Sequence, residues 1–205
     1  MNCGFSATTL LRSADLAQEN FTKCLVSEWK RCDPDVPVPF GIFLGFIKDQ
    51  NLSMIRWLVE QDCKLCEDAL ELATQIGDIE ILAYLWENYD GERSNRYFDI
   101  LISAEGMEEA KSAQVMKWML QNEFTSDRHL DIVAASLGYI CWLDVLYKLY
   151  GGKINFNIPI AAAKHDQILV IYWCRGYGIP IDIDSIRQVA TRNGAKKVLS
   201  WLEKS

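Results

Sequence analysis

Cys63 and Cys66 form the only Cys-x-x-Cys pair in this 205-residue sequence, and this spacing is typical of metal and redox sites. A structural zinc site needs about four ligands, and neither a second such pair nor paired histidines complete the set. A thioredoxin-like redox site requires a βαβ setting, whose pattern is absent here. We therefore expect these cysteines to lie in a loop and in the core, with a metal or redox role as the alternative.

His129 and His165 are the only histidines, and they are the candidates for general acid–base catalysis. A catalytic histidine needs a nucleophile and oxyanion-stabilising groups in one site. No Ser or Cys nucleophile followed by oxyanion-hole glycines accompanies either histidine. We predict that the protein is not an enzyme and uses no cofactor or metal; a stoichiometrically bound metal or cofactor would revive the enzymatic alternative.

Three carboxylates, Glu105, Glu108 and Glu109, lie close together near the middle of the chain. Such a group can ligate a cation or meet a basic partner, but acidic clusters are most often solvated surface. We expect a solvated loop here.

The charge balance limits the classes of partner. The formal net charge is −7, whereas nucleic-acid binding depends on Lys and Arg concentrated on one face. The N-terminal residues lack a basic segment followed by an apolar one, and no run approaches the roughly 18 apolar residues of a membrane span. Seven scattered cysteines favour reduced thiols. We predict a soluble cytoplasmic protein, with the nucleus or association with a virion as the alternatives, that binds neither nucleic acid nor membrane.

A short pattern of small, apolar and aromatic residues recurs through the chain and is clearest at Ala73–Leu85. The same frame returns at Ala134–Leu146 and near Ala162 and Ala190. One position of this frame is occupied in turn by Trp57, Tyr84, Trp118, Val145, Trp173 and Trp201. The spacings are 27, 34, 27, 28 and 28 residues. A period of this length indicates a stack of helix-turn-helix repeats, so we expect these aromatic residues to lie in the core.

Each repeat is predicted to consist of two helices joined by a tight turn. In the clearest repeat the helices cover 67–76 and 79–88, and Gly77 and Gly138 occupy turn positions that favour positive φ. Asp127 and Ser185 are the predicted N-caps of two later repeats. The long spacing places an insert at about 104–112, on a surface loop.

The chain is expected to divide into two parts. Residues 1–39 form a helical N-terminal cap, in which Ser6 is one candidate N-cap, followed by a linker with three prolines in residues 33–39. Residues 40–205 form an all-α solenoid of about six repeats. A divergent terminal element is expected because a stack of repeats leaves an apolar face at each end.

The frame Ala-x-x-x-Gly-(Asp/Tyr)-Ile-x-(Ile/Trp)-Leu-x-x-Leu resembles the ankyrin repeat. It departs from that repeat in its period, which is usually about 33 residues, and in lacking the Thr-Pro-Leu-His opening. The short, Trp-rich form is similar to the ankyrin-like repeats of large DNA viruses of amoebae and of some protists, and distantly to multigene-family proteins of African swine fever virus. The resemblance implies a binding module without catalytic residues.

From this reading we predict a protein–protein interaction scaffold that binds a protein partner through its concave face and loop tips. The residues expected to contact the partner are Lys64, Asp68, Glu71, Gln75, Arg128, Asp131, Lys164 and His165. A structural, self-associating protein, for example one associated with a virion, is the alternative.

Overall fold

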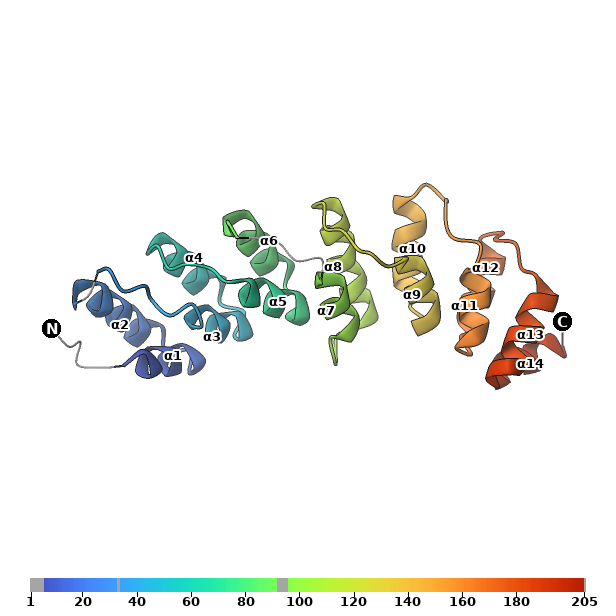
Figure 1. The fold of residues 1–205 in the computed structure, drawn as a ribbon, viewed down its shortest axis with the longest axis horizontal. Coiled ribbons are helices and arrows are strands. Elements are labelled where there is room, and N and C mark those ends of the chain that lie inside the picture. Colours follow the sequence, from blue (N-terminus) through green and yellow to red (C-terminus); the bar gives the residue numbers. More distant parts are fainter. Residues whose placement is uncertain (1–5, 33, 92–95, 205) are drawn as a thin grey trace. The chain divides into compact units, whose positions relative to one another are not determined.

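The protein is entirely α-helical in the part of the chain that the structure describes. The computed structural model describes residues 6–32, 34–91 and 96–204, and these contain fourteen helices and no strand (Figure 1). The predicted all-α class is confirmed. By its internal contacts the chain divides into an N-terminal unit, Met1–Met107, and a C-terminal unit, Glu108–Ser205. This division differs from the boundary expected between residues 39 and 40.

Each unit contains seven helices among its described residues. Those of the N-terminal unit are α1 (Ala7–Asp15), α2 (Glu19–Cys32), α3 (Ile42–Lys48), α4 (Leu52–Glu60), α5 (Glu67–Ile76), α6 (Ile79–Asn88) and α7 (Tyr97–Ser103). Those of the C-terminal unit are α8 (Glu109–Gln121), α9 (Leu130–Leu137), α10 (Ile140–Leu149), α11 (Ile158–Lys164), α12 (Ile168–Gly176), α13 (Ile183–Asn193) and α14 (Lys196–Leu202).

Within each unit, odd-numbered first helices alternate with even-numbered second helices. First helices pack on first helices, as α1 on α3, α3 on α5 and α5 on α7, and likewise α9 on α11 and α11 on α13. Second helices follow a parallel series, α8 to α10, α12 and α14. The predicted N-terminal cap is thus itself a helix pair, α1 and α2, whose first helix joins the same series (Figure 1).

The turn inside each helix pair contains a residue with positive φ. Gly77 and Gly138, at φ 74° and 82°, confirm the prediction for these two glycines. The same turn position holds Gln50 at 54° and Asp166 at 58°. Residues other than glycine rarely adopt positive φ. The backbone of the turn therefore keeps the same geometry even where the residue is not glycine.

Two predicted N-caps are wrong. α13 begins after Asp182, because the Asp182 carboxylate accepts hydrogen bonds from the amides of Asp184 and Ser185. Ser185 therefore lies inside the helix. α9 begins after His129, two residues beyond Asp127, at the buried Leu130. Ser6, in contrast, is the N-cap of α1 and accepts from the Thr9 amide.

The insert predicted at 104–112 is shorter than expected. Residues 104–108 form the connection, and Glu109 begins α8. Ser112 is buried in the first turn of that helix and donates a hydrogen bond to the Glu109 carbonyl. The connection is still the longest between consecutive first and second helices of the described chain, since the others have two or three residues.

Most residues at the recurring aromatic position are half-buried, and only one of the tryptophans there belongs to the core. Trp173 is buried, but Trp57, Trp118 and Trp201 are half-buried, which corrects the prediction. Several of these rings contact a side chain of the preceding second helix. The Trp201 ring, for example, lies edge-on to Tyr172 with 6.3 Å between the ring centroids. Trp142, from another register, is completely buried.

Candidate functional site

The eight residues predicted to contact a partner fall in both units. Lys64, Asp68, Glu71 and Gln75 belong to the N-terminal unit, and Arg128, Asp131, Lys164 and His165 to the C-terminal unit. Six of them are exposed; Glu71 and Asp131 are half-buried. Of these six, Asp68, Gln75 and Lys164 lie on first helices, His165 directly follows α11, and Lys64 and Arg128 lie in the loops before α5 and α9.

Glu71 and Asp131 are engaged in contacts that hold the fold. A Glu71 oxygen lies 2.6 Å from an Arg96 guanidinium nitrogen, across the α5–α7 contact. One Asp131 oxygen accepts a hydrogen bond from the Asn155 amide at 2.9 Å, and the other accepts from the Ile132 amide. Because Asp131 accepts a hydrogen bond from the loop before α11, changing its charge would disturb the packing of α9 and α11 as well as the surface.

The cysteine pair does not have the environment of a reactive site. Cys63 is buried, and burial raises the pKa of its thiol to about 11. Cys66 directly precedes α5, and burial raises the pKa of its thiol as well. A raised pKa keeps a thiol protonated and poorly nucleophilic near neutral pH. Among the described residues, no three His, Cys, Asp or Glu side chains are grouped so that they could hold a metal ion.

The histidines lie at helix ends on the surface. His165 follows α11 and is exposed. His129 precedes α9 and lines a small pocket of about 390 Å³ together with Arg128 and Asp131. Ser126 also lines this pocket, but its hydroxyl accepts from the Arg128 amide at 3.1 Å and so serves the local turn.

The acidic group near the middle of the chain has two different roles. Glu105 and Glu108 are exposed, as expected for a solvated loop. Glu109 is half-buried and accepts a hydrogen bond from the backbone amide of Cys141, in the first turn of α10. The Glu109 carboxylate thus supplies the N-terminal cap of a helix in the neighbouring pair.

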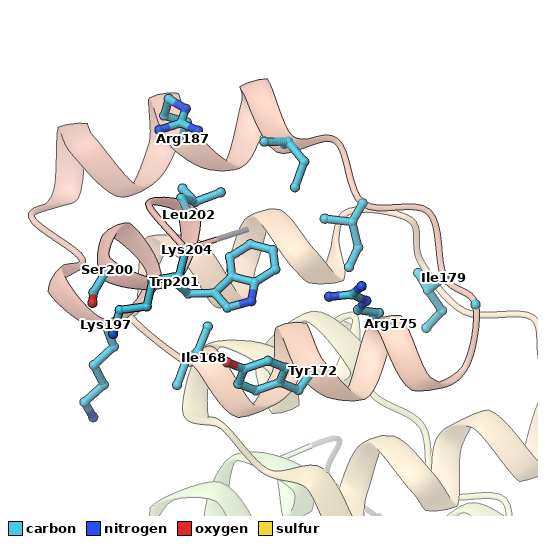
Figure 2. Close-up of a pocket in the computed structure, with 13 residues that line it drawn as sticks. Ile168, Tyr172, Arg175, Ile179, Arg187, Lys197, Ser200, Trp201, Leu202 and Lys204 are labelled. Atoms are coloured by element: carbon cyan, nitrogen blue, oxygen red, sulfur yellow. The ribbon is translucent and has the colours of Figure 1, made fainter.

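A groove of about 1050 Å³ lies in the C-terminal unit, bounded by α12, α13, α14 and the loop between α12 and α13. Figure 2 shows Trp201 in its middle, with Tyr172 below the indole and Arg175 directed toward it. The apolar side chains that line it are Ile168, Tyr172, Ile179, Ile181, Ile183, Trp201 and Leu202.

Four cations accompany this apolar lining. Arg175 comes from α12, Arg187 from α13, Lys197 from α14, and Lys204 follows α14 (Figure 2). None of the described residues that line the groove is acidic. We call the groove with these cations the basic groove. It can hold an anionic ligand that also buries apolar surface.

The basic groove fits a division of charge along the chain. The N-terminal unit has 18 Asp and Glu against 9 Lys and Arg, a net charge of −9. The C-terminal unit has 10 Asp and Glu against 12 Lys and Arg, a net charge of +2. The C-terminal unit therefore has a small net positive charge, although the net charge of the whole chain is negative.

Sequence reasoning missed the basic groove because it assigned Trp173 and Trp201 alike to the core. The two residues are equivalent in the repeat, but only Trp201 lines the groove. The available signal was the surplus of Lys and Arg in the last third of the chain, which the negative total charge obscured.

Comparisons with known proteins identify no relative. No family model matches the chain, and neither a curated protein nor a solved structure is significantly similar to it. In the described part of the chain, no helix combines the length and apolar character needed to cross a membrane.

Proposed function

We propose that this protein is a non-catalytic interaction scaffold, an ankyrin-like solenoid that binds a protein partner through its first helices and the adjoining turns. The observation that carries the proposal is the series of first helices in each unit, which pack directly on one another. Such packing places equivalent exposed side chains of successive repeats in a row, and repeat proteins use surfaces of this kind to bind partners.

The exposed residues along the first helices differ from those that hold the stack. Asp68 and Gln75 on α5, and Lys164 on α11, are exposed. Buried small residues on the same helices, such as Ala73 and Ala163, allow the neighbouring first helices to approach. One face thus serves packing and the other is available to a partner.

Affinity purification with mass spectrometry tests the proposal when variants of equal charge change are compared. Asp68→Lys with Lys164→Glu alters two first helices, whereas Glu80→Lys with Lys117→Glu alters exposed positions on second helices. The wild type and the second-helix variant should capture the same small set of proteins, and the first-helix variant should lose it. Equal capture by all three chains would contradict binding through the first helices.

A self-associating structural protein is the second candidate. Exposed apolar side chains favour it, among them Phe156 at 73%, Leu169 at 66% and Phe40 at 55%. Exposed apolar surface is a common feature of association sites. Light scattering during size-exclusion chromatography measures the mass directly; a mass that rises with concentration supports self-association, and a constant 23.4 kDa contradicts it.

The proposal places the protein in the cytoplasm. All six cysteines in the described residues are free thiols, as is usual in a reducing compartment.

A further inference from the structure

We propose that the basic groove binds an acidic peptide segment of a partner protein, one in which Leu or Phe side chains alternate with Asp and Glu. This inference rests on the proposed scaffold function and specifies the chemistry of one partner and the place where it binds. It depends on two observations: the apolar lining and the distribution of the cations.

The apolar lining offers surface that an apolar anchor would cover. Tyr172 is 49% exposed and Ile183 is 39% exposed, both on the groove. Trp201 is half-buried and lies edge-on to Tyr172. Aromatic residues of this kind dominate the binding energy of protein interfaces when a partner buries them, so one or two Leu or Phe side chains fit this surface.

The cations are distributed around the lining on separate elements. Arg175, Arg187 and Lys197 belong to three different helices, and Figure 2 shows them on different sides of Trp201. A compact anion is bound by donors that converge on one point. Cations spread around an apolar surface instead match an extended segment that carries several carboxylates between its apolar anchors.

The aliphatic content of the groove favours a peptide over single-stranded nucleic acid. Nucleic-acid strands bind to rows of aromatic residues on which successive bases stack. Here Ile168, Ile179, Ile181 and Leu202 provide much of the lining.

A second copy of the chain fits the groove less well than a separate partner. The acidic, proline-rich segment before α3 carries exposed apolar side chains, but it is held to its own unit. The Val36 carbonyl accepts a hydrogen bond from the Trp29 indole at 3.1 Å, and Val38 is buried. This segment is therefore not a free arm that could enter the groove of another molecule.

Fluorescence anisotropy with defined peptides tests the proposal. The probe is a labelled peptide of about 14 residues with Leu or Phe at every third or fourth position and Asp or Glu between them. One control peptide replaces the acids by Lys, and another replaces Leu and Phe by Ser. Only the first peptide should bind, and its affinity should fall as salt is added, because exposed charges are screened.

Two protein variants of equal charge change locate the binding. Arg175→Glu with Lys197→Glu should weaken binding at least tenfold. Arg192→Glu with Lys196→Glu should change it less than twofold, because these exposed residues do not line the groove. Ile183→Ser should weaken binding several-fold through the apolar lining, and circular dichroism checks that each variant is folded.

Several results would overturn the proposal. They are equal binding of the Lys peptide, equal losses in the two charge variants, and tighter binding of oligo-dT that depends on Arg175 and Lys197. A concentration-dependent dimer that Lys197→Glu abolishes would assign the groove to self-association. If the Arg175→Glu, Lys197→Glu variant keeps every partner captured by the wild type and the peptide fails to bind, the groove proposal fails while the scaffold proposal stands. Loss of capture in the first-helix variant reports on the scaffold alone.

Discussion

The two units are built from the same kind of helix pair, yet their neighbouring pairs are joined by different chemistry. In the N-terminal unit a cation covers the recurring aromatic ring: Lys23 lies 5.7 Å from the Trp57 ring centroid, and Arg56 lies 5.3 Å from that of Tyr84. In the C-terminal unit the equivalent Trp173 donates a hydrogen bond from its indole to Asp144 at 2.7 Å.

The second helices also begin differently in the two units. α4 and α6 are capped by the residues that directly precede them, Asn51 and Asp78. In each case the side-chain oxygen accepts a hydrogen bond of 3.0 Å from a backbone amide of the first turn. α10 receives its cap from Glu109, and α14 from Asp166, whose carboxylate accepts from the Val198 amide at 3.0 Å. Glu109 begins α8, and Asp166 lies in the turn between α11 and α12, so both acceptors come earlier in the chain than the helix pair they cap.

The comparison shows that the same kind of helix pair can supply hydrogen-bond acceptors to the first-turn amides of its second helix in two ways. A local cap stabilises one helix, whereas a cap from the neighbour also fixes the register between two pairs. We therefore expect the stability of a helix pair in the C-terminal unit to depend more on the presence of the helix pair before it. This dependence can be tested by comparing equivalent positions of the two units.

The largest effect is expected at the buried tryptophan of the C-terminal unit. Trp142 is fully buried, and its indole donates to the Ser112 hydroxyl at 2.8 Å. Trp142→Ala should lower the free energy of unfolding by about 3 to 5 kcal/mol. The equivalent residue of the N-terminal unit is Ile81, which is buried but smaller. Ile81→Ala should therefore lower the free energy of unfolding, measured in urea, by less than Trp142→Ala does. Equal costs would show that the larger ring and its hydrogen bond add nothing.

Alkaline pH should destabilise both units through their buried thiols. Burial raises the pKa of Cys63 to about 11 and of Cys174 to about 12, from an ordinary value of 9.0. Above pH 9 the unfolded chain loses these protons first, so stability falls by up to about 1.4 kcal/mol per pH unit for each thiol. The decline from Cys63 ends near pH 11, and that from Cys174 near pH 12.

Urea unfolding between pH 8 and 10.5 measures this loss. Cys63→Ala and Cys174→Ala should each flatten the decline, while Cys24→Ala, which changes an exposed thiol, should not. A decline of unchanged slope in both buried-thiol variants would disprove the assignment.

The two kinds of helix cap should differ in the reach of their effects. Asp78→Ala and Asp166→Ala should each cost about 0.5 to 2 kcal/mol, as losses of helix caps do. Hydrogen exchange should distinguish them. Asp78→Ala should loosen the first turn of α6, whereas Asp166→Ala should reduce protection along α14 and at its contact with α12. If protection from exchange is lost only in the first turn of the capped helix in both variants, the two kinds of cap do not differ in reach.

The smallest effect is expected at the turns, where it should differ in sign between the units. Gln50 and Asp166 both adopt positive φ, which costs roughly 1 to 2 kcal/mol for residues other than glycine. Gln50→Gly should stabilise the N-terminal unit by about 0.5 kcal/mol after the entropy of the unfolded glycine is counted. Asp166→Gly should destabilise its unit because it removes the cap of α14. Thermal unfolding of both variants would show whether the signs differ.

Local sequence patterns predicted much of the fold. The helices Glu67–Ile76 and Ile79–Asn88 agree with the structure to the residue, and Gly77 and Gly138 have the predicted positive φ. These features depend on residues close together in the chain, on helical periodicity and on the conformational freedom of glycine. The all-α class followed from them.

What the sequence could not provide depends on contacts between helix pairs that are distant in the chain. The caps of α10 and α14 come from residues 32 positions earlier, and no local rule points to Glu109 or Asp166. Likewise, nothing in the sequence distinguishes the exposed Asp68 from the ion-paired Glu71. The basic groove combines side chains from three helices, so only their packing brings its cations and its apolar lining together.

The cap that Asp166 provides also has a consequence for the order in which the chain acquires its structure. Starting a helix is the unfavourable step in its formation, and at α14 one amide of the first turn is satisfied only when Asp166 is in place. During synthesis Asp166 leaves the ribosome before α14, so we expect the preceding helix pair to take its place before α14 forms. Pulse-labelled hydrogen exchange during refolding should accordingly show α11 and α12 protected before α14, with consolidation in the direction of translation.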